Sequence, residues 1–476
     1  MRVLLTSHQF LPKFSFGTEK LTFECGRELS KRGHEVQVMT SEPASEELPH
    51  GVQKDYVYEG LNVRAFGMSL GTTQDPLRYE FDNPEMADRM RALIIETAPD
   101  LLHVWHAGRL SGSIIAAARE MGVPVVFTAT DFWSICRVIH LRRADTGELC
   151  TGPNRAGTNC LRCYIARTHV SQEMKDHYLN KSDAELTAYV NLAKSPVLKN
   201  SRYGKRIRTV VERIPFLKDT INSADRVIAP TRLTRDMLLK NGVKPNLLRV
   251  SRYGIETSHI SSVPQSPENP ETVRFGFMGG LVRHKGVHNL VKAFRLNPRD
   301  MKAELKIYGD PERAPEYFSE IEDLAGDDPR IIFPGAFEGA KVGEVLPEID
   351  VLVVPSAWYE NTPLVVYEAF ASGTPVVATN LGGLSEVIEH GKNGLLFAVD
   401  DVEDMSTQLT RFLEEPDLIS RLREGIEPVR TVAESADDLE QVYREVIEAR
   451  RSRKPERRGA GGPLRSSGRT PPAAER

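Results

Sequence analysis

The stretch from residue 350 to residue 394 constrains the fold of this chain more than any other. It begins with a short apolar, β-branched run at 351–354, which predicts a buried parallel strand. Pro355 breaks this run, Pro363 marks the start of a helix, and Gly373 is placed to end that helix in the left-handed conformation. A second strand is predicted at 375–378. This order of elements predicts a parallel α/β sheet, in which ligands bind at the carboxyl ends of the strands.

Two acidic residues, Glu360 and Glu368, lie within this unit. Glu368 stands among apolar residues of the predicted helix, and a carboxylate in such surroundings needs a specific partner. Leu364 and Val365 fall in the first helical turn, where free amides and the helix dipole favour an anion such as a diphosphate. The alternative is that both acids are simply solvated, because single acids on helices are common.

The wider pattern resembles a known family. Glu360 and Glu368 form an E-x7-E pair within P-S-x-W-x-E-N-T-P-L, followed by A-S-G-T-P-V-V-A-T and G-x-N-G. This sequence pattern resembles the signature of family-four retaining glycosyltransferases (glycosyl transferases group 1). The resemblance implies the GT-B fold, an α/β architecture of two Rossmann-like, doubly wound parallel-sheet domains that face each other across a cleft. It also implies that Glu360 contacts the donor sugar and Glu368 the nucleotide ribose, while the amides of Leu364 and Val365 hold the diphosphate.

A second donor loop is implied near residue 279. Gly279, Lys285 and the glycine after it resemble the family's phosphate loop, with Lys285 as a point charge for the diphosphate. Relatives often have Arg or Ser after the first glycine, whereas this chain has Gly280. Arg283 is therefore proposed, from proximity alone, as the second positive charge.

The other side of the cleft is expected in the first half of the chain. A strand at 1–7 runs into a loop and helix at Gly17, and the resemblance places Gly17 in a loop that faces the donor across the cleft. His106 lies just past the end of a strand predicted within 99–106. A lone histidine at such a place is more often structural, but the resemblance places His106 in the acceptor-side pocket. Asp131 follows Thr130 where relatives commonly carry His-Asp. Glu360, His106 and Asp131 are the candidate catalytic residues.

Four of the five cysteines lie within 28 residues: Cys136, Cys150, Cys160 and Cys163. They stand in a segment rich in Gly, Pro, Asn and Arg, which has little to bury, and the final C-x-x-C is a metal-knuckle spacing. Disulfides are disfavoured in the cytosol, which leaves structural zinc, an iron–sulfur cluster or four free thiols. No cofactor is expected to be required for catalysis, and the cysteine loop marks a subset of the family.

Charge and composition add the remaining expectations. Residues 168–225 are predicted to be helical throughout and carry a basic stretch, which could contact an anionic membrane surface or equally be a solvated helix face. Its charged members are Lys199, Arg202, Lys205, Arg206, Arg208 and Arg213. Residues 451–476 contain eight Lys or Arg and two Glu, and their composition predicts a disordered basic tail. No signal peptide or membrane span is recognisable, so the cytoplasm is expected, with peripheral contact at the inner membrane face.

The predicted organisation is an acceptor-side domain at 1–262, with the cysteine loop at 136–163 and the helical insert at 168–225. A nucleotide-sugar domain follows at 271–432, and a helix at 433–450 crosses back to the first domain. The expected activity is hexose transfer, with retention, from a nucleotide diphosphate sugar to a glycan or lipid-linked acceptor in polysaccharide or glycoconjugate synthesis; no nucleic acid partner is expected. The alternatives are a sugar-nucleotide epimerase of the same fold and a non-catalytic, metal-stabilised binding module.

Overall fold

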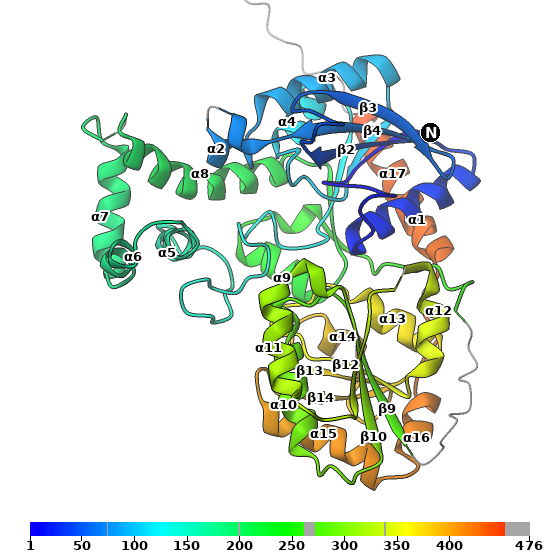
Figure 1. Ribbon diagram of the computed structural model, residues 1–476. Coiled ribbons are helices and arrows are strands. Elements are labelled where there is room, and N and C mark those ends of the chain that lie inside the picture. The colour runs from blue at the N-terminus through cyan, green and yellow to red at the C-terminus, as the bar shows by residue number, and fades with distance from the viewer. Residues whose placement is uncertain (74, 199, 261–271, 338, 453–476) are drawn as a thin grey trace, which may run out of the picture.

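The computed structural model describes residues 1–73, 75–198, 200–260, 272–337 and 339–452, which form two α/β domains, one above the other in Figure 1. Each domain is built on one mainly parallel sheet, so the predicted α/β class is confirmed. Residues 261–271, at the boundary between the two predicted domains, and most of the predicted basic tail lie outside the described residues.

The first sheet has the strand order β3-β4-β2-β1-β5-β6-β7-β8. Its strands are β1 (Arg2–Thr6), β2 (Glu35–Pro43), β3 (Gln53–Tyr58), β4 (Leu61–Met68), β5 (Leu101–Val104), β6 (Val125–Thr128), β7 (Arg226–Ala229) and β8 (Leu248–Val250). Only β3 and β4 pair antiparallel among these strands. Apolar side chains pack on both faces of the sheet, which is why its central strands are buried throughout.

The hairpin of β3 and β4 adds one antiparallel pair to the otherwise parallel first sheet. Glu59 (φ 43°) and Gly60 (φ 85°) join the two strands in a two-residue turn with positive φ at both positions. That backbone twist matches the twist of the paired strands, so the chain folds back at once without a helix.

The helices of the first domain are α1 (Gly17–Lys31), α2 (Pro76–Tyr79), α3 (Pro84–Thr97), α4 (Ser113–Glu120), α5 (Thr158–Ala166), α6 (Gln172–Leu179), α7 (Asp183–Lys194), α8 (Arg202–Asn222) and α9 (Arg232–Lys240). Residues 168–225 are therefore three helices and not one. Ser171, Ser182 and Ser201 each cap a new helix with the side-chain oxygen, which fixes the breaks. Helices α5 to α8 form the insert that projects to the left in Figure 1 and has its own small apolar core.

The second sheet has the strand order β11-β10-β9-β12-β13-β14 and is wholly parallel. Its strands are β9 (Val273–Met278), β10 (Ala303–Tyr308), β11 (Ile331–Gly335), β12 (Val351–Val354), β13 (Val376–Thr379) and β14 (Gly394–Phe397). The accompanying helices are α10 (Val287–Leu296), α11 (Pro315–Ala325), α12 (Val342–Val345), α13 (Leu364–Ala371), α14 (Leu384–Val387), α15 (Val402–Glu414), α16 (Leu418–Glu424) and α17 (Val432–Ser452). The helical region predicted from residue 402 onward is broken twice, near Pro416 and between Gly425 and Pro428.

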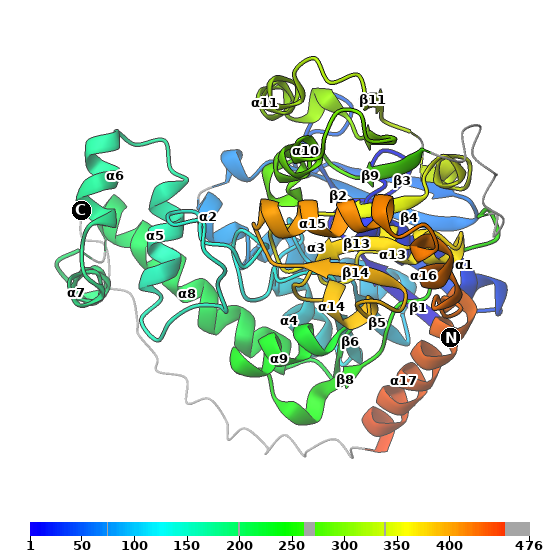
Figure 2. The same cartoon turned by 90° about the horizontal axis from the view of Figure 1, so that it is seen from below.

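Helix α17 belongs to the second half of the chain but packs on the first domain. It lies beside α1 in both views (Figures 1 and 2), and its apolar face joins the core on that side of the first sheet. Tyr443 is fully buried there, and its hydroxyl lies 2.6 Å from Nδ1 of His103. The other ring nitrogen of His103 contacts the hydroxyl of Thr128 at 2.7 Å. The polar atoms of this interior site are therefore satisfied across two parts of the chain.

Each sheet has a point where the chain leaves a central strand in opposite directions. In the first sheet β1 lies between β2 and β5, and His8 and His106 follow β1 and β5. In the second sheet β9 lies between β10 and β12, and Gly279 and Glu360 follow β9 and β12. Ligands of open α/β sheets bind at such switch points, so the fold directs these residues toward binding regions.

The contact between Tyr443 and His103 yields a test of how α17 is held. In the Tyr443→Phe variant, His103 keeps its position but loses a buried partner, so the free energy of unfolding should fall by about 2 kcal/mol. Urea unfolding followed by circular dichroism measures this change. Glu448→Gln, at an exposed position of the same helix, is the matched control and should unfold like the parent protein. An unchanged midpoint for Tyr443→Phe would contradict the assigned role.

Candidate active site

A pocket of about 400 Å³ opens between the two domains. Phe16, Gly17 and Lys20 line it from the first domain, at the start of α1. The second domain contributes Gly279, Gly280, Tyr308, Gly309, Arg313, Leu364, Val365 and Glu368, among others. The structure thus brings both glycine loops and the first turn of α13 to one place.

Glu368 has the specific partner that its sequence context demanded. Its side chain is largely buried on α13, and its Oε1 lies 2.5 Å from Nζ of Lys20. Lys20 comes from α1, on the other side of the pocket. The sequence analysis missed Lys20, although it follows the Gly17-Thr18-Glu19 turn that was singled out.

Glu360 is buried and accepts three hydrogen bonds on one carboxylate oxygen. The donors are Nζ of Lys285 at 2.6 Å, Oγ of Ser356 at 2.6 Å and Nε1 of Trp358 at 2.9 Å. Burial alone would raise the pKa of Glu360, but the charge of Lys285 and these hydrogen bonds outweigh it and lower the pKa. Glu360 is therefore an ionised carboxylate at neutral pH, although it is buried and does not line the pocket itself.

Gly286 explains how Lys285 reaches this position. Gly286 has φ 75°, and a Cβ there would lie 1.9 Å from the carbonyl oxygen of Pro355. Only glycine allows the loop after β9 to pass so close to the loop after β12. The close approach sets Lys285 against Glu360.

The first turn of α13 faces the pocket through Leu364 and Val365. Pro363 is its N-cap and provides no side-chain cap, and amides at the start of a helix have no carbonyl partner within it. Gly373, with φ 75°, follows the end of the helix as predicted. The arrangement suits an anionic group at the amino end of α13.

Arg283 is not placed where the sequence suggested. Its guanidinium pairs with Glu320 over the ring of Tyr317, at an exposed position, and it does not line the pocket. Arg313 does line the pocket, with its guanidinium carbon 4.3 Å from the centroid of the Phe16 ring. Among the described residues, Arg313 rather than Arg283 therefore accompanies Lys20 as a cation of this pocket.

His106 and Asp131 lie together at the switch point of the first sheet. Nδ1 of His106 accepts from the amide of Gly108 at 2.9 Å, so the proton resides on Nε2, which donates to Asp131 at 2.9 Å. Burial acts to raise the pKa of Asp131, but the adjacent His106 outweighs it and lowers the pKa. Both nitrogens of His106 are thus engaged, and the pair forms a fixed polar surface.

Two neighbours of this pair were missed. The ring of His8 lies 4.2 Å from that of His106, and burial, with His106 next, holds the pKa of His8 well below its usual value. Glu19 is fully buried with its Oε1 3.4 Å from Nε2 of His8, and burial raises the pKa of Glu19. The signal for His8 was its place directly after β1, which matches the place of His106 after β5.

The loop after β12 also ties the domains together. Asn361 donates to the carbonyl oxygen of Ala129 at 2.7 Å, and its Oδ1 accepts from the hydroxyls of Thr231 and Thr234. Glu386 accepts from the amide of Arg232 at 2.8 Å and from that of the next residue. Polar groups of the second domain are therefore satisfied by the first.

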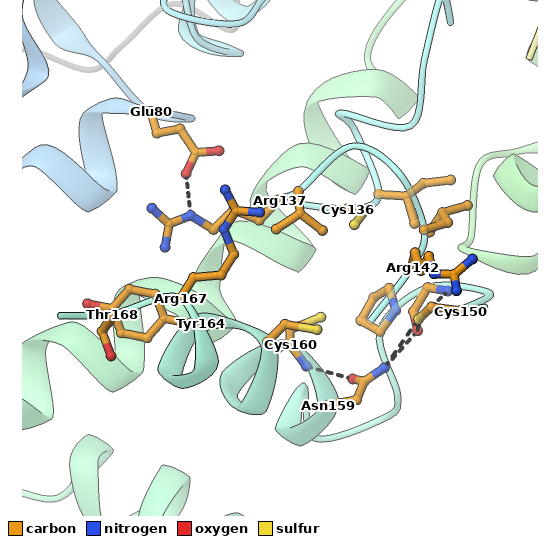
Figure 3. A pocket seen from close by; sticks show the side chains of 16 residues that line it. Glu80, Cys136, Arg137, Arg142, Cys150, Asn159, Cys160, Tyr164, Arg167 and Thr168 are labelled. Atoms are coloured by element: carbon orange, nitrogen blue, oxygen red, sulfur yellow. Dashed lines mark hydrogen bonds and ion pairs between the residues drawn. The ribbon is translucent and has the colours of Figure 1, made fainter. Parts of the chain in front are cut away.

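The four cysteines line a separate cavity of about 400 Å³ in the first domain (Figure 3). Cys160 and Cys163 lie on α5 and not in a loop as the sequence suggested, because a helix begins at Thr158. Within the described residues no three His, Cys, Asp or Glu side chains are grouped as they would be around one metal ion. The thiols nevertheless share one cavity.

Two family models match the chain: Glycosyltransferase Family 4 over residues 17–181 and Glycosyl transferases group 1 over residues 260–427, together more than half of its length. The chain belongs to family 4 of the glycosyltransferases. The resemblance carried by Glu360, Glu368 and their surroundings is confirmed, whereas membership of a cysteine-loop subset remains a prediction.

Individual relatives of this glycosyltransferase match over part of their length. It is 30% identical over 206 residues to the sulfoquinovosyl transferase SQD2 of Arabidopsis thaliana, covering 40% of the chain and 38% of that protein. It is 30% identical over 211 residues to the α-maltose-1-phosphate synthase of Mycolicibacterium smegmatis, covering 41% of the chain and 53% of that protein. The chain thus spans about half or less of these two curated relatives.

Solved structures resemble the glycosyltransferase over nearly its whole length. Sucrose-phosphate synthase from Thermosynechococcus elongatus has a TM-score of 0.66 at 20% identity, covering 94% of the chain and 99% of that structure. HepE of Anabaena in complex with UDP has a TM-score of 0.61 at 14% identity, covering 94% and 100%. These similarities confirm the GT-B fold predicted from the sequence.

The ion pair of Glu360 and Lys285 gives a prediction for stability against pH. Because the pair lowers the pKa of Glu360 in the folded protein, its contribution is present above the unfolded pKa of about 4.3 and is lost as the pH falls through the lower folded value. In Lys285→Met the cation is lost while the hydrogen bonds from Ser356 and Trp358 remain, so the pKa of Glu360 rises relative to the parent and the buried carboxylate stabilises the fold less at neutral pH. The variant should lose about 2 kcal/mol at neutral pH, and the difference should narrow as the pH approaches about 4.

Chemical unfolding at a series of pH values measures this difference. Lys392→Met, which removes an exposed lysine of the same domain, is the control and should differ little from the parent at any pH. A difference for Lys285→Met that stays constant over the whole range would show that Glu360 does not depend on Lys285.

Proposed function

We propose that this glycosyltransferase moves a hexose from a nucleotide diphosphate sugar to a glycan or lipid-linked acceptor, with retention at the anomeric carbon. The observation that carries the proposal is the pocket itself. Glu368, the amides of Leu364 and Val365, and the glycine loop at Gly279 meet at the switch point of the second sheet. Glu360 lies on the same β12–α13 connection, eight residues before Glu368.

Within this proposal each donor-side residue has a chemical task. Glu360, ionised and held by Lys285, accepts hydrogen bonds from sugar hydroxyls, while Glu368 accepts from the ribose. The amino end of α13 and Lys285 stabilise the charge that grows on the departing diphosphate. Lys20 from the first domain and Arg313 from the second add positive charge to the pocket.

Nucleotide-sugar donors are consistent with the similar structures. The titles of two HepE structures record UDP and UDP-glucose as ligands of that protein. UDP-glucose is therefore the first donor to test. The hexose and the retention remain parts of the proposal, supported by the family's E-x7-E arrangement.

The acceptor is proposed to bind against the first sheet. His106 presents a ring whose two nitrogens are already bonded, to Gly108 and Asp131. Such a fixed surface orients a hydroxyl by contact rather than by taking its proton. The proposed contribution of His106 and Asp131 is therefore positioning of the acceptor opposite the donor sugar.

A donor panel tests the proposal. UDP-, GDP- and ADP-linked hexoses are offered with lipid-linked glycan fractions as acceptors, and nucleotide release and product stereochemistry are measured. One nucleotide series should support transfer with retention. Glu360→Gln should lower kcat/KM by about two orders of magnitude, because the charged acceptor of the sugar hydroxyls is lost.

Glu414→Gln, which changes an exposed acid at the end of α15, is the matched control and should keep full activity. Epimerisation of a nucleotide sugar without any acceptor would favour the epimerase alternative. A correctly folded protein that binds no nucleotide sugar would favour the binding-module alternative. Inverted products would overturn retention alone.

We further propose that the outer end of the insert contacts an anionic membrane during acceptor binding. The insert tip is defined here as Leu192, Val197 and Tyr203. The exposed fractions of these three residues are 46%, 82% and 65%. Arg202 and Lys205 lie beside it and are exposed. Apolar side chains next to cations suit a surface with acidic headgroups.

Arg213 does not take part, because it is buried against Glu80 and Trp133. Across the part of the chain that the structure describes, no helix is long and apolar enough to span a bilayer.

Vesicle flotation tests this contact. The protein should float with vesicles that contain anionic lipid at low salt and release as salt screens the charges. The double variant Val197→Asp, Tyr203→Asp should stay at the bottom of the gradient. Ile95→Asp replaces a comparably exposed apolar residue, 72% exposed on α3, and should float like the parent. Equal flotation of both variants would place the contact elsewhere.

A further inference from the structure

The segment between β6 and α5 is long and lacks regular structure. Residues 129–157 contain neither helix nor strand, apart from an isolated bridge between Arg142 and Leu149. Loops of this length inside a compact domain are uncommon and need a specific source of order. Ala129, Phe132, Trp133, Ile135 and Leu141 anchor the first half of this segment in the core, whereas residues 142–156 are partly or fully exposed. Apolar burial therefore accounts for the order of the first half but not of the second.

The four cysteines converge on the cavity beneath this loop. Cys136 and Cys150 come from the loop, and Cys160 and Cys163 come from successive positions on one face of α5. Figure 3 shows the sulfur atoms of Cys136, Cys150 and Cys160 directed toward the common space. No other described cysteine lies nearby, since Cys25 is buried in the core beside α17.

Backbone amides are directed at the sulfur atoms. The sulfur of Cys150 accepts from the amide of Gly152 at 3.4 Å, and that of Cys136 accepts from the amides of Leu141 and Val138. The sulfur of Cys163 accepts from the amide of Ala144 at 3.4 Å. Amide donors of this kind orient and stabilise thiolates that bind a metal.

The wall of the cavity is lined by three arginines, Arg137, Arg142 and Arg167. Arg137 contacts Glu80 at 2.9 Å and Arg142 contacts Asp400 at 2.9 Å, whereas Arg167 has no ion pair among the described residues. Four thiolates around a divalent ion or an iron–sulfur cluster carry net negative charge. The charge of Arg167 therefore complements a thiolate-bound centre rather than four neutral thiols.

We propose that Cys136, Cys150, Cys160 and Cys163 bind one metal centre as thiolates and that this centre fixes the loop. Both zinc and a cubane iron–sulfur cluster take four cysteine ligands. Because no three ligands among the described residues surround a single-ion position, a zinc ion requires the four sulfurs to draw together. A cluster is larger than a single ion, and the cavity that the four cysteines line has a volume of about 400 Å³.

The loop connects this centre to the donor side. Arg142 donates to the carbonyl oxygen of Ala357 and contacts Asp400 at 2.9 Å. The ring of His140 lies 4.8 Å from that of Trp358, whose indole nitrogen donates to Glu360. A metal centre that fixes residues 129–157 therefore also holds these residues against the loop after β12, which carries Glu360.

Metal analysis of the full chain, purified without chelators and without oxygen, tests the proposal. The expected result is either about one zinc per chain or about four iron with matching acid-labile sulfide and broad visible absorption. Removing the metal should expose four additional reactive thiols. It should also speed tryptic cleavage at Arg142, Arg143 and Arg155. A preparation with neither metal and four free thiols, or with disulfides between these cysteines, would overturn the proposal.

Two variants sharpen the result. Cys160→Ser should reduce the bound metal at least tenfold, whereas Cys25→Ala, at the buried cysteine outside the cavity, should keep it all. Full metal content in Cys160→Ser would contradict the assigned ligand set. If Cys160→Ser does not fold, the thiol count of the parent protein before and after chelation decides the matter by itself. Metal content is measured independently of transfer activity, so failure of the proposed donor chemistry would not affect it.

Discussion

Buried polar groups of the β12–α13 connection find their partners in the other domain, and this requirement determines how the two domains face each other. Glu368 meets Lys20, Asn361 meets Ala129 and two threonine hydroxyls, and the more distant Glu386 meets the first amides of α9. An unpaired carboxylate or amide in these places would cost several kcal/mol. The carboxyl ends of the two sheets are consequently held opposite each other, and the pocket that Lys20 and Glu368 line is a surface shared by both domains.

Much of this was readable from the sequence because local rules and function agree there. The strand at 351–354, the helix at Leu364–Ala371 and the left-handed Gly373 follow from burial pattern and end signals that need no knowledge of the rest of the chain. The two acids could be recognised because carboxylates within an apolar helix and loop conflict with burial unless they serve a purpose.

What the sequence could not supply were partners distant along the chain. Lys20 lies 348 residues from Glu368, and no local sequence pattern around either residue indicates that the two side chains pair. Arg283 was proposed for its nearness to Lys285, yet a turn at Gly286 directs Lys285 inward while Arg283 faces Glu320. In the helical insert, three serine side chains cap the starts of three separate helices. The sequence pattern of the segment favours helix on both sides of these serines, so the breaks were not predicted.

The crossing segments that join the two domains also run side by side. Ile255 donates its amide to the carbonyl oxygen of Arg430 at 3.0 Å and forms a parallel bridge with Thr431, just before α17 returns to the first domain. A Cβ on Gly254 would lie 1.8 Å from the carbonyl oxygen of Thr431, so the two chains are as close as backbones allow. Two adjacent connections restrict sliding of one domain past the other more strongly than rotation of the domains about the common line of the connections.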